Sequence, residues 1–421
     1  MNAQEKLLQL LHSPDEANVK LALEMAKGMP EINLDKLVQD YRDLYRCLFN
    51  QERKQKLVSE QIVALNQSLI YAARQGLTTI PNSLDKLTNL HELNLSYNEL
   101  TALPESLGKL TNLQQLNLRE NQLTALPENL GMLENLQVLS VRDNQLSSLP
   151  RSLEKLINLH NLDLGRNKLA LWPKGLEKLV RLKKLHLNNN QLTHLPETIR
   201  NLHNLQILWL EHNQLASWPG GLEKLVNLSD LSLRHNQLDY LPETLGNLKK
   251  LDHLWLNNNY LTFLPKNLGK LINLKYLWLH NNQLVSIPKS LEKLVKLQYL
   301  HLEKNQLSSL PDSFGKLWNL RELHLNDNLL TSLPESMGKM VGLQQLYLGN
   351  NQLTSLPKSI ENLVNLEKLY LQNNQFATLP EGVEDLVNLQ FLLLSGNPLA
   401  ESTLEEIKNR LPYCEVYFKQ A

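Results

Sequence analysis

The sequence of 421 residues has few cysteines, no excess of one charge and no long apolar run, and so lacks features that are typical of several large classes of protein. It contains only two cysteines, Cys47 and Cys414, too few for the disulfides that often close the ends of extracellular repeat domains. Positive and negative side chains balance at 43 each, which argues against a nucleic-acid binder that works through a basic surface. The longest apolar runs are far shorter than the roughly 18 to 20 residues of a membrane-spanning helix.

Targeting and catalytic motifs are missing as well. The opening residues MNAQEKLLQLLHSPDE lack the basic and then apolar segments of a secretory signal, so we expect a cytoplasmic protein without membrane insertion. There is no G-x-x-x-x-G-K-[ST], G-x-G-x-x-G, G-x-S-x-G or H-E-x-x-H motif. Both cysteines lie in segments where small buried side chains are expected rather than nucleophiles. We predict no enzymatic activity and no cofactor.

What the sequence does contain is one repeated unit of 23 residues. Asparagine recurs at this spacing from Asn98 to Asn397, and proline from Pro81 to Pro380. Between them runs L-x-x-L-x-L-x-x-N-x-L-x-x-L-P-x-x-L-x-x-L-x-N, as in LHELNLSYNELTALPESLGKLTN. A fixed period of this length indicates a solenoid of stacked coils. We assign residues 67–400 to about fourteen to fifteen such units.

The chemistry of the unit predicts its local structure. Alternation in x-L-x-L-x indicates a short strand with its leucines on one side, and stacking these strands gives a parallel sheet over a continuous core. The asparagine turns the chain and its amide can bond backbone groups that the turn leaves unpaired. Proline blocks a regular helix in the segment that returns, where we expect the glycines to serve turns.

Residues 1–66 have a different pattern, which we interpret as a helical N-terminal cap. The segment Ser13-Pro14-Asp15-Glu16 predicts a capping box with proline at the first helical position. Gly28 is expected to end that helix, and apolar residues at helical spacing predict another after Asn33.

Residues 401–421 are interpreted as a C-terminal cap. Ser402 and Glu405 predict the start of a helix, and Pro412 follows it. The tail then alternates, with Cys414, Val416 and Phe418 on one face, which predicts a last strand that closes the core.

The outward positions of the predicted strands vary most and bear on function. The position between the two strand leucines is small and polar in the first repeats, and from His186 onward it is mainly aromatic or imidazole. Contiguous apolar surface rimmed by polar groups usually marks an interaction site, and tryptophan and tyrosine are enriched at binding hot spots. We predict a partner-binding belt, the aromatic belt, made of Trp209, His253, Trp255, Tyr276, Trp278, His280, Tyr299, His301, His324, Tyr347 and Tyr370.

The same positions allow other interpretations. Adjacent strands place equivalent side chains about 4.8 Å apart, so rings such as Trp255 and Trp278 are near enough to stack and stiffen the sheet without binding anything. Stacking and recognition are compatible. His280, His301 and His324, with Glu303 nearby, also suggest a metal site, but histidine is a common filler of such columns and we assign no metal.

The unit LPxxLxxLxNLxxLxLxxN, repeated over residues 67–400, resembles that of intracellular leucine-rich repeat proteins of the Ras-suppressor and scribble type and of bacterial cytosolic homologues. The resemblance implies an α/β solenoid: a curved horseshoe with a parallel β-sheet on the concave face, a helical N-terminal cap and a helix–strand C-terminal cap. It also implies a non-catalytic signalling scaffold that binds a protein partner in the horseshoe. The alternative is a small-ligand or glycan receptor that uses the same aromatic surface; no nucleic-acid partner is expected.

Overall fold

The computed structural model describes residues 2–49, 57–400 and 403–418, and the chain divides into two compact units, Met1–Leu192 and Thr193–Ala421. Both are built from coils in which a three-residue strand is followed by a turn and a short 3-10 helix. The sixteen strands of the described residues are parallel and follow chain order, with β1–β6 in the first unit and β7–β16 in the second. The predicted parallel solenoid is confirmed.

The first unit begins with four α-helices and continues with six strands. The helices are α1 Ala3–Leu11, α2 Glu16–Lys27, α3 Leu34–Phe49 and α4 Val58–Leu65. The strands are β1 Leu69–Tyr71, β2 Glu92–Asn94, β3 Gln115–Asn117, β4 Val138–Ser140, β5 Asn161–Asp163 and β6 Lys184–His186. The 3-10 helices between them are η1 Asn82–Lys86, η2 Glu105–Lys109, η3 Glu128–Met132, η4 Arg151–Lys155 and η5 Leu176–Lys178.

The second unit holds ten strands and the last helix. The strands are β7 Ile207–Trp209, β8 Asp230–Ser232, β9 His253–Trp255, β10 Tyr276–Trp278, β11 Tyr299–His301, β12 Glu322–His324, β13 Gln345–Tyr347, β14 Lys368–Tyr370, β15 Phe391–Leu393 and β16 Glu415–Tyr417. The α-helix α5 spans Thr403–Arg410. The 3-10 helices are η6 Glu197–Asn201, η7 Leu222–Lys224, η8 Glu243–Asn247, η9 Lys266–Lys270, η10 Lys289–Lys293, η11 Asp312–Lys316, η12 Glu335–Lys339, η13 Lys358–Asn362 and η14 Val383–Asp385.

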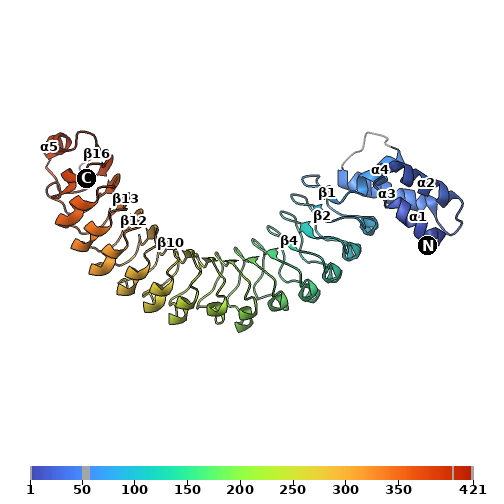
Figure 1. The fold of residues 1–421 in the computed structure, drawn as a ribbon, viewed down its shortest axis with the longest axis horizontal. Coiled ribbons are helices and arrows are strands. Elements are labelled where there is room, and N and C mark those ends of the chain that lie inside the picture. The colour runs from blue at the N-terminus through green and yellow to red at the C-terminus, as the bar shows by residue number, and fades with distance from the viewer. Residues whose placement is uncertain (1, 50–56, 401–402, 419–421) are drawn as a thin grey trace. The chain divides into compact units, whose positions relative to one another are not determined.

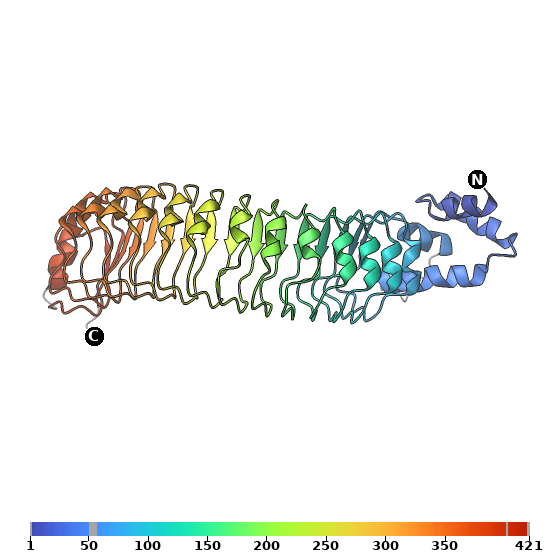
Figure 2. The same cartoon turned by 90° about the horizontal axis from the view of Figure 1, so that it is seen from below.

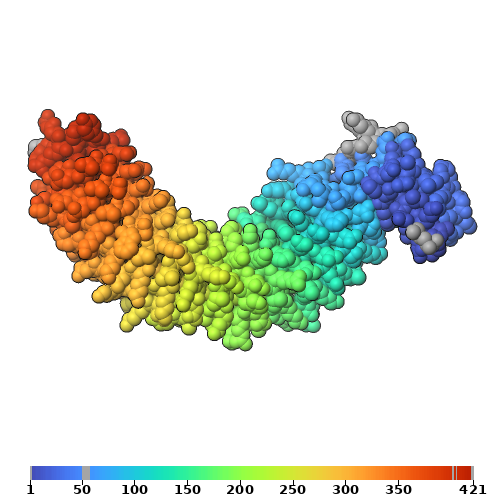
Figure 3. Space-filling model, viewed as in Figure 1, coloured from blue at the N-terminus to red at the C-terminus, as the bar shows by residue number. Residues whose placement is uncertain are grey.

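The leucines of the repeat form the core within each unit. The central residue of each strand from β1 to β15 is buried, as Leu254 and Leu277 show with no exposed surface, whereas Val416 of β16 is half-buried. Within each unit the strands lie on the inner side of the curve and the 3-10 helices on the outer side (Figures 1 and 2). Within each unit successive coils pack side by side, and Figure 3 shows them as adjoining bands of changing colour. Alternation therefore fixes which side chains of each strand lie on the inner, concave face.

The repeated asparagine, from Asn98 to Asn397, makes the main side-chain hydrogen bonds of the coils. The side-chain amide of Asn259 donates to the carbonyl oxygens of Leu256 and Leu233, both at 3.0 Å, and its oxygen accepts from the backbone N–H of Leu238 at 3.0 Å. The asparagine is almost fully buried, so these bonds replace water for three backbone groups of two adjacent coils. The predicted role of the asparagine is confirmed.

Three details of the sequence prediction need correction. Helix α2 is capped by Asp15, whose side chain accepts from the N–H of Ala17 at 2.9 Å, and not by Ser13. Pro14 therefore precedes the cap rather than opening the helix. Asn33 does cap α3 through a bond from the Lys36 N–H, whereas the cap predicted at Ser402 lies outside the described residues.

The glycines within the 3-10 helices are the third correction, because they do not serve turns: Gly108, Gly131, Gly246, Gly269, Gly315 and Gly338. Gly315 has an ordinary negative φ and lies where a β-carbon would overlap the carbonyl oxygen of Ser336 in the next coil. Gly269 lies against Ser290 in the same way. These glycines allow close packing between successive 3-10 helices.

Within the part of the chain that the structure describes, no helix combines the length and the apolar character needed to cross a membrane.

Candidate functional site

The aromatic belt lies on the concave face of the second unit, and all eleven of its predicted residues come from coils of that unit. Its side chains are half-buried, since each rests on its neighbours while one edge remains open to solvent. The structure brings most of them together in two parallel ladders of stacked rings, one from the first residue of each strand and one from the third.

The first ladder joins three rings on consecutive strands. His253 stacks on Tyr276 with ring centroids 4.3 Å apart, and Tyr276 stacks on Tyr299 at 4.8 Å, with interplanar angles of 9° and 5°. The ladder exists because the in-register parallel pairing of β9, β10 and β11 places these residues directly opposite one another.

The second ladder is longer and mixes imidazole with aromatic rings. Trp278 stacks on His301 at 4.4 Å, His301 on His324 at 4.0 Å, and His324 on Tyr347 at 4.0 Å. Tyr347 then stacks on Tyr370 at 4.3 Å. Burial, and after it the neighbouring His301 charge, lower the pKa of His324 to about 4, so this ring is uncharged near pH 7 and stacks as a neutral aromatic.

The ladder extends beyond the residues that the sequence singled out. Phe391 lies 5.1 Å from Tyr370, and Tyr417 of β16 lies 5.2 Å from Phe391, both with tilted rings. Tyr417 was missed because it lies outside the 23-residue repeat. The alternation of the tail was the signal that places Tyr417 on the concave side of a last strand.

Trp255 and Trp278 do not stack on each other, as one interpretation of the sequence suggested, since Trp255 stacks on His253 and Trp278 stacks on His301. Trp209 and Trp255 instead line a surface cavity of about 210 Å³ together with Glu211, Ser232 and Arg234. The Trp209 indole N–H donates to an Asp230 carboxylate oxygen at 2.9 Å, which fixes this ring. Burial raises the pKa of Asp230.

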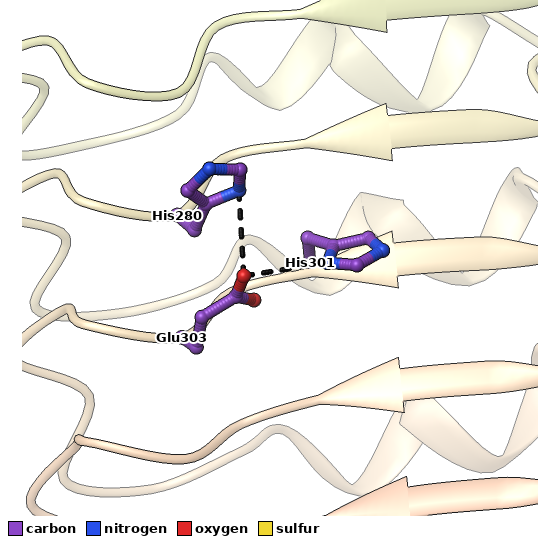
Figure 4. Close-up of side chains that lie close together, drawn as sticks. All are labelled: His280, His301 and Glu303. Atoms are coloured by element: carbon purple, nitrogen blue, oxygen red, sulfur yellow. Dashed lines mark hydrogen bonds and ion pairs between the residues drawn. The ribbon is translucent and has the colours of Figure 1, made fainter.

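A polar cluster lies beside the second ladder, at the residues just after β10 and β11. Nδ1 of His280 and Nδ1 of His301 lie 3.4 Å and 3.3 Å from the same carboxylate oxygen of Glu303, as Figure 4 shows. Burial raises the pKa of Glu303, but the hydrogen bond with His301 and the charges of both histidines outweigh it, and the pKa lies below its usual value. Burial is also the main cause of the lowered pKa of His280.

The fold and these geometries define a class of protein. The leucine-rich repeat family matches as a leucine-rich repeat region over residues 261–350, as a leucine rich repeat over 343–399, as two copies over 88–131, and as single repeats over 135–156 and 181–202. This chain belongs to the leucine-rich repeat family. Members of the family are generally non-catalytic scaffolds for protein–protein interaction, and no catalytic family is among these matches.

Among solved structures, the chain is similar to the Leptospira interrogans LRR protein LIC12759, with 36% identity, a TM-score of 0.75, and coverage of 92% of this chain and 98% of that one. It also resembles the ectodomain of the Arabidopsis receptor kinase HAESA in complex with an extended IDA peptide hormone, with 32% identity and a TM-score of 0.58 over 76% of this chain and 60% of that one. The Arabidopsis GASSHO1/SCHENGEN3 ectodomain in complex with CASPARIAN STRIP INTEGRITY FACTOR 2 has 29% identity and a TM-score of 0.55, over 82% and 51% of the two chains. A search of curated protein sequences found no match.

Proposed function

We propose that this chain is a non-catalytic scaffold that binds a protein partner on the concave face of its second unit, through the aromatic belt. The observation that carries the proposal is the run of stacked rings from Trp278 to Tyr370, which presents a continuous row of ring edges on an accessible face. Aromatic side chains supply large contact areas and dominate the energetics of many interfaces.

Stacking supports recognition rather than competing with it. A free side chain loses about 0.5–1.5 kcal/mol of rotational freedom when a partner immobilises it. Here each ring is already held between its neighbours, as His301 is between Trp278 and His324. The belt is therefore pre-organised, and a partner has less ordering to impose.

Similar proteins support a proteinaceous partner. The HAESA and GASSHO1/SCHENGEN3 ectodomains were both solved in complex with the ligands named above, the first of which is a peptide hormone. The partner of this chain is proposed to be a protein or peptide segment that packs against ring edges, with the polar cluster at the border of the contact.

The test is capture of a partner by the double variant Trp255→Ala and Trp278→Ala. Partners are identified by pull-down from host-cell lysate and mass spectrometry, and the affinity of the leading candidate is then measured with purified proteins. We expect the double variant to lose at least tenfold in affinity while the protein remains folded, with a loss of about 1 kcal/mol in stability for each stacked pair removed.

Trp318→Ala is the matched control, because Trp318 is 50% exposed and lies just after η11, away from the strands. It makes the same chemical change outside the belt and should leave capture intact. A double variant that binds the partner as tightly as the Trp318→Ala protein removes the belt from the binding site.

The cavity beside Trp209 and Trp255 favours a second candidate function, a receptor for a small ligand or glycan. Indole rings provide stacking platforms for sugar rings, and Glu211 and Arg234 supply hydrogen-bonding groups beside them. Titration of tryptophan fluorescence with a panel of glycans and metabolites tests this function. A response that Trp209→Ala abolishes, and Trp318→Ala preserves, would assign the ligand to the cavity.

We further propose that residues 1–66 and 401–421 are caps around the repeats at 67–400, and that the protein is cytoplasmic. The change from α-helices to strands between α4 and β1, and from the repeat to α5 after β15, supports the division. Cys47 and Cys414 are both unpaired, which suits a reducing compartment.

A further inference from the structure

The polar cluster beside the second ladder has a geometry that stacking and partner binding leave unexplained. His280 and Glu303 occupy the same position of adjacent coils, two residues beyond β10 and β11. His301 ends β11 and lies two residues before Glu303, on the same face of the chain. The repeat thus brings two imidazoles and one carboxylate to one point, with ligand atoms that all lie within 4.8 Å of one another.

The distances are unsuited to strong hydrogen bonds. A charge-assisted N–H···O⁻ bond spans about 2.7–2.9 Å, whereas the two Nδ1 atoms lie 3.4 Å and 3.3 Å from the Glu303 oxygen. Each imidazole turns a nitrogen toward this one oxygen, as the dashed lines in Figure 4 show. The contact of His301 lies at the outer limit of hydrogen-bond length, and the contact of His280 is not a hydrogen bond.

The same distances are those between the ligands of a small tetrahedral metal ion. Zinc binds nitrogen and oxygen ligands at about 2.0–2.1 Å, so two such ligands at a tetrahedral angle lie roughly 3.3–3.4 Å apart. Both nitrogen–oxygen separations of the cluster match this spacing. Few rotamer changes are therefore needed to place an ion between the three atoms.

Burial adds a second observation. The three side chains are only 13–18% exposed. Nδ1 of His280 and Oε2 of Glu303 are buried atoms without a hydrogen-bond partner in the described structure. Unsatisfied buried polar atoms are costly, and a bound ion is one way in which proteins satisfy them.

We propose that His280, His301 and Glu303 bind one Zn²⁺ ion on the concave face of the second unit, with water in the fourth position. Two imidazoles and a carboxylate are a common donor set for zinc. This inference revises our interpretation of the sequence, which assigned no metal, and it stands whether or not the aromatic belt binds a protein.

A neighbouring set, His301, Glu322 and His324, shares His301 with this site. Its carboxylate lies 3.7 Å from Nε2 of His324, farther than a tetrahedral pair of ligands. We therefore assign the ion to the set with Glu303. A variant of His324 distinguishes the two candidate sites, because only the neighbouring set contains this residue.

The test is isothermal titration of the full chain with ZnCl2, after removal of any affinity tag and dialysis against a chelator. We expect one ion per chain. Glu303→Gln keeps the size of the side chain but removes its negative charge, and His280→Gln removes one imidazole ligand. Each should weaken zinc binding at least tenfold, while His324→Gln should change it less than threefold. His194→Gln, on an exposed histidine outside the strands, is the remote control.

The visible absorption of bound Co²⁺ reports the geometry of the metal site, and a change in folding alone does not produce this signal. A tetrahedral Co²⁺ ion gives a much stronger visible absorption than a hydrated ion at the surface, and geometry of this kind is diagnostic of the site. The wild type and His324→Gln should show the strong band, and Glu303→Gln should lose it while keeping its far-ultraviolet circular dichroism and its metal-free melting temperature.

Two outcomes overturn the proposal. One is a wild type that takes up no stoichiometric zinc and no tetrahedral cobalt. The other is zinc binding that survives in Glu303→Gln and His280→Gln but disappears in His324→Gln, since the ion would then belong to the neighbouring set.

Discussion

At the scale of single residues, the fold depends on the backbone conformation of the turn that follows each strand. The residue before the repeated asparagine has a positive φ in coil after coil, for example 56° at Asn350 and 56° at Lys304. This left-handed conformation costs roughly 1 kcal/mol or more for a residue other than glycine, and it persists only where its surroundings enforce it. The buried asparagine is that enforcing element, because its three hydrogen bonds fix the turn.

Asn351→Ala tests this role of the asparagine. The side chain donates to the carbonyl oxygens of Leu325 and Leu348 at 3.0 Å, and accepts from the Leu330 N–H at 3.0 Å. Alanine leaves these backbone groups buried and unpaired, so we expect a loss of about 3 kcal/mol in the free energy of unfolding. Urea unfolding followed by circular dichroism measures it.

Gln352→Ala is the control for this variant, because the neighbouring side chain is exposed and its removal should change stability by less than about 0.5 kcal/mol. Equal stability of the two variants would show that the asparagine ladder contributes little.

At the scale of elements, the 3-10 helices of the return segments are held at a spacing that glycine permits. In η11 and η12 the backbone of one coil approaches the next so closely that a β-carbon on Gly315 meets the Ser336 carbonyl group. Other coils have glutamate at the same place in the repeat, as at Glu292 of η10, so the requirement is local to pairs of coils. Glycine is required here because the neighbouring 3-10 helices lie too close for a β-carbon, and not because of its φ angle.

Gly315→Ala should therefore destabilise the second unit. Overpacking of a close contact typically costs about 1–3 kcal/mol, and here the atom that must move is a backbone oxygen. We expect a lower melting temperature by differential scanning calorimetry. Gly220→Ala makes the same change at a site where a β-carbon would lie 4.0 Å from Cγ of Glu197, and it should be almost neutral.

An unchanged melting temperature in Gly315→Ala would mean that the coils relax apart at little cost. The packing argument for these glycines would then be wrong.

At the scale of the whole molecule, the ends of the repeat array determine whether its core is covered. At the C-terminal end, Ile407 and Leu411 are buried and β16 pairs with β15 in parallel, Leu392 opposite Val416. At the N-terminal end, the Cys47 thiol donates to the Thr79 carbonyl oxygen at 3.5 Å and Lys86 lies over the ring of Tyr41. Solenoids need such caps because each coil covers only one side of its neighbour.

Removal of residues 403–421 should make the protein aggregate. The truncation unpairs β15, which bonds to β16 through the Leu394 N–H and the Tyr417 carbonyl oxygen at 2.8 Å, and leaves an open strand edge beside apolar side chains. Size-exclusion chromatography with light scattering should show large species, together with a lower melting temperature.

Tyr413→Ser, at a residue that is 96% exposed within the same segment, should remain monodisperse to the same extent as the wild type. A truncated chain that behaves like this control would show that the last helix and strand are dispensable.

The sequence by itself determined the repeat, the parallel sheet and the face on which the aromatic side chains lie. A period of 23 residues and an alternation of two are local properties, so Trp278, His301 and Tyr347 follow from counting along the chain. The N-cap of α2 was misplaced by two residues because Ser13, Pro14 and Asp15 all suit a helix start, and the structure shows that the Asp15 side chain accepts from the N–H of Ala17.

Tertiary structure alone decided which of these side chains contact one another. It decided that Trp255 pairs with His253 and Trp278 with His301, that Gly315 is needed for spacing, and that two imidazoles share one oxygen of Glu303. Such contacts depend on rotamers and on the distance between coils, to within a few tenths of an ångström. A one-dimensional pattern contains the order of the residues but not that distance.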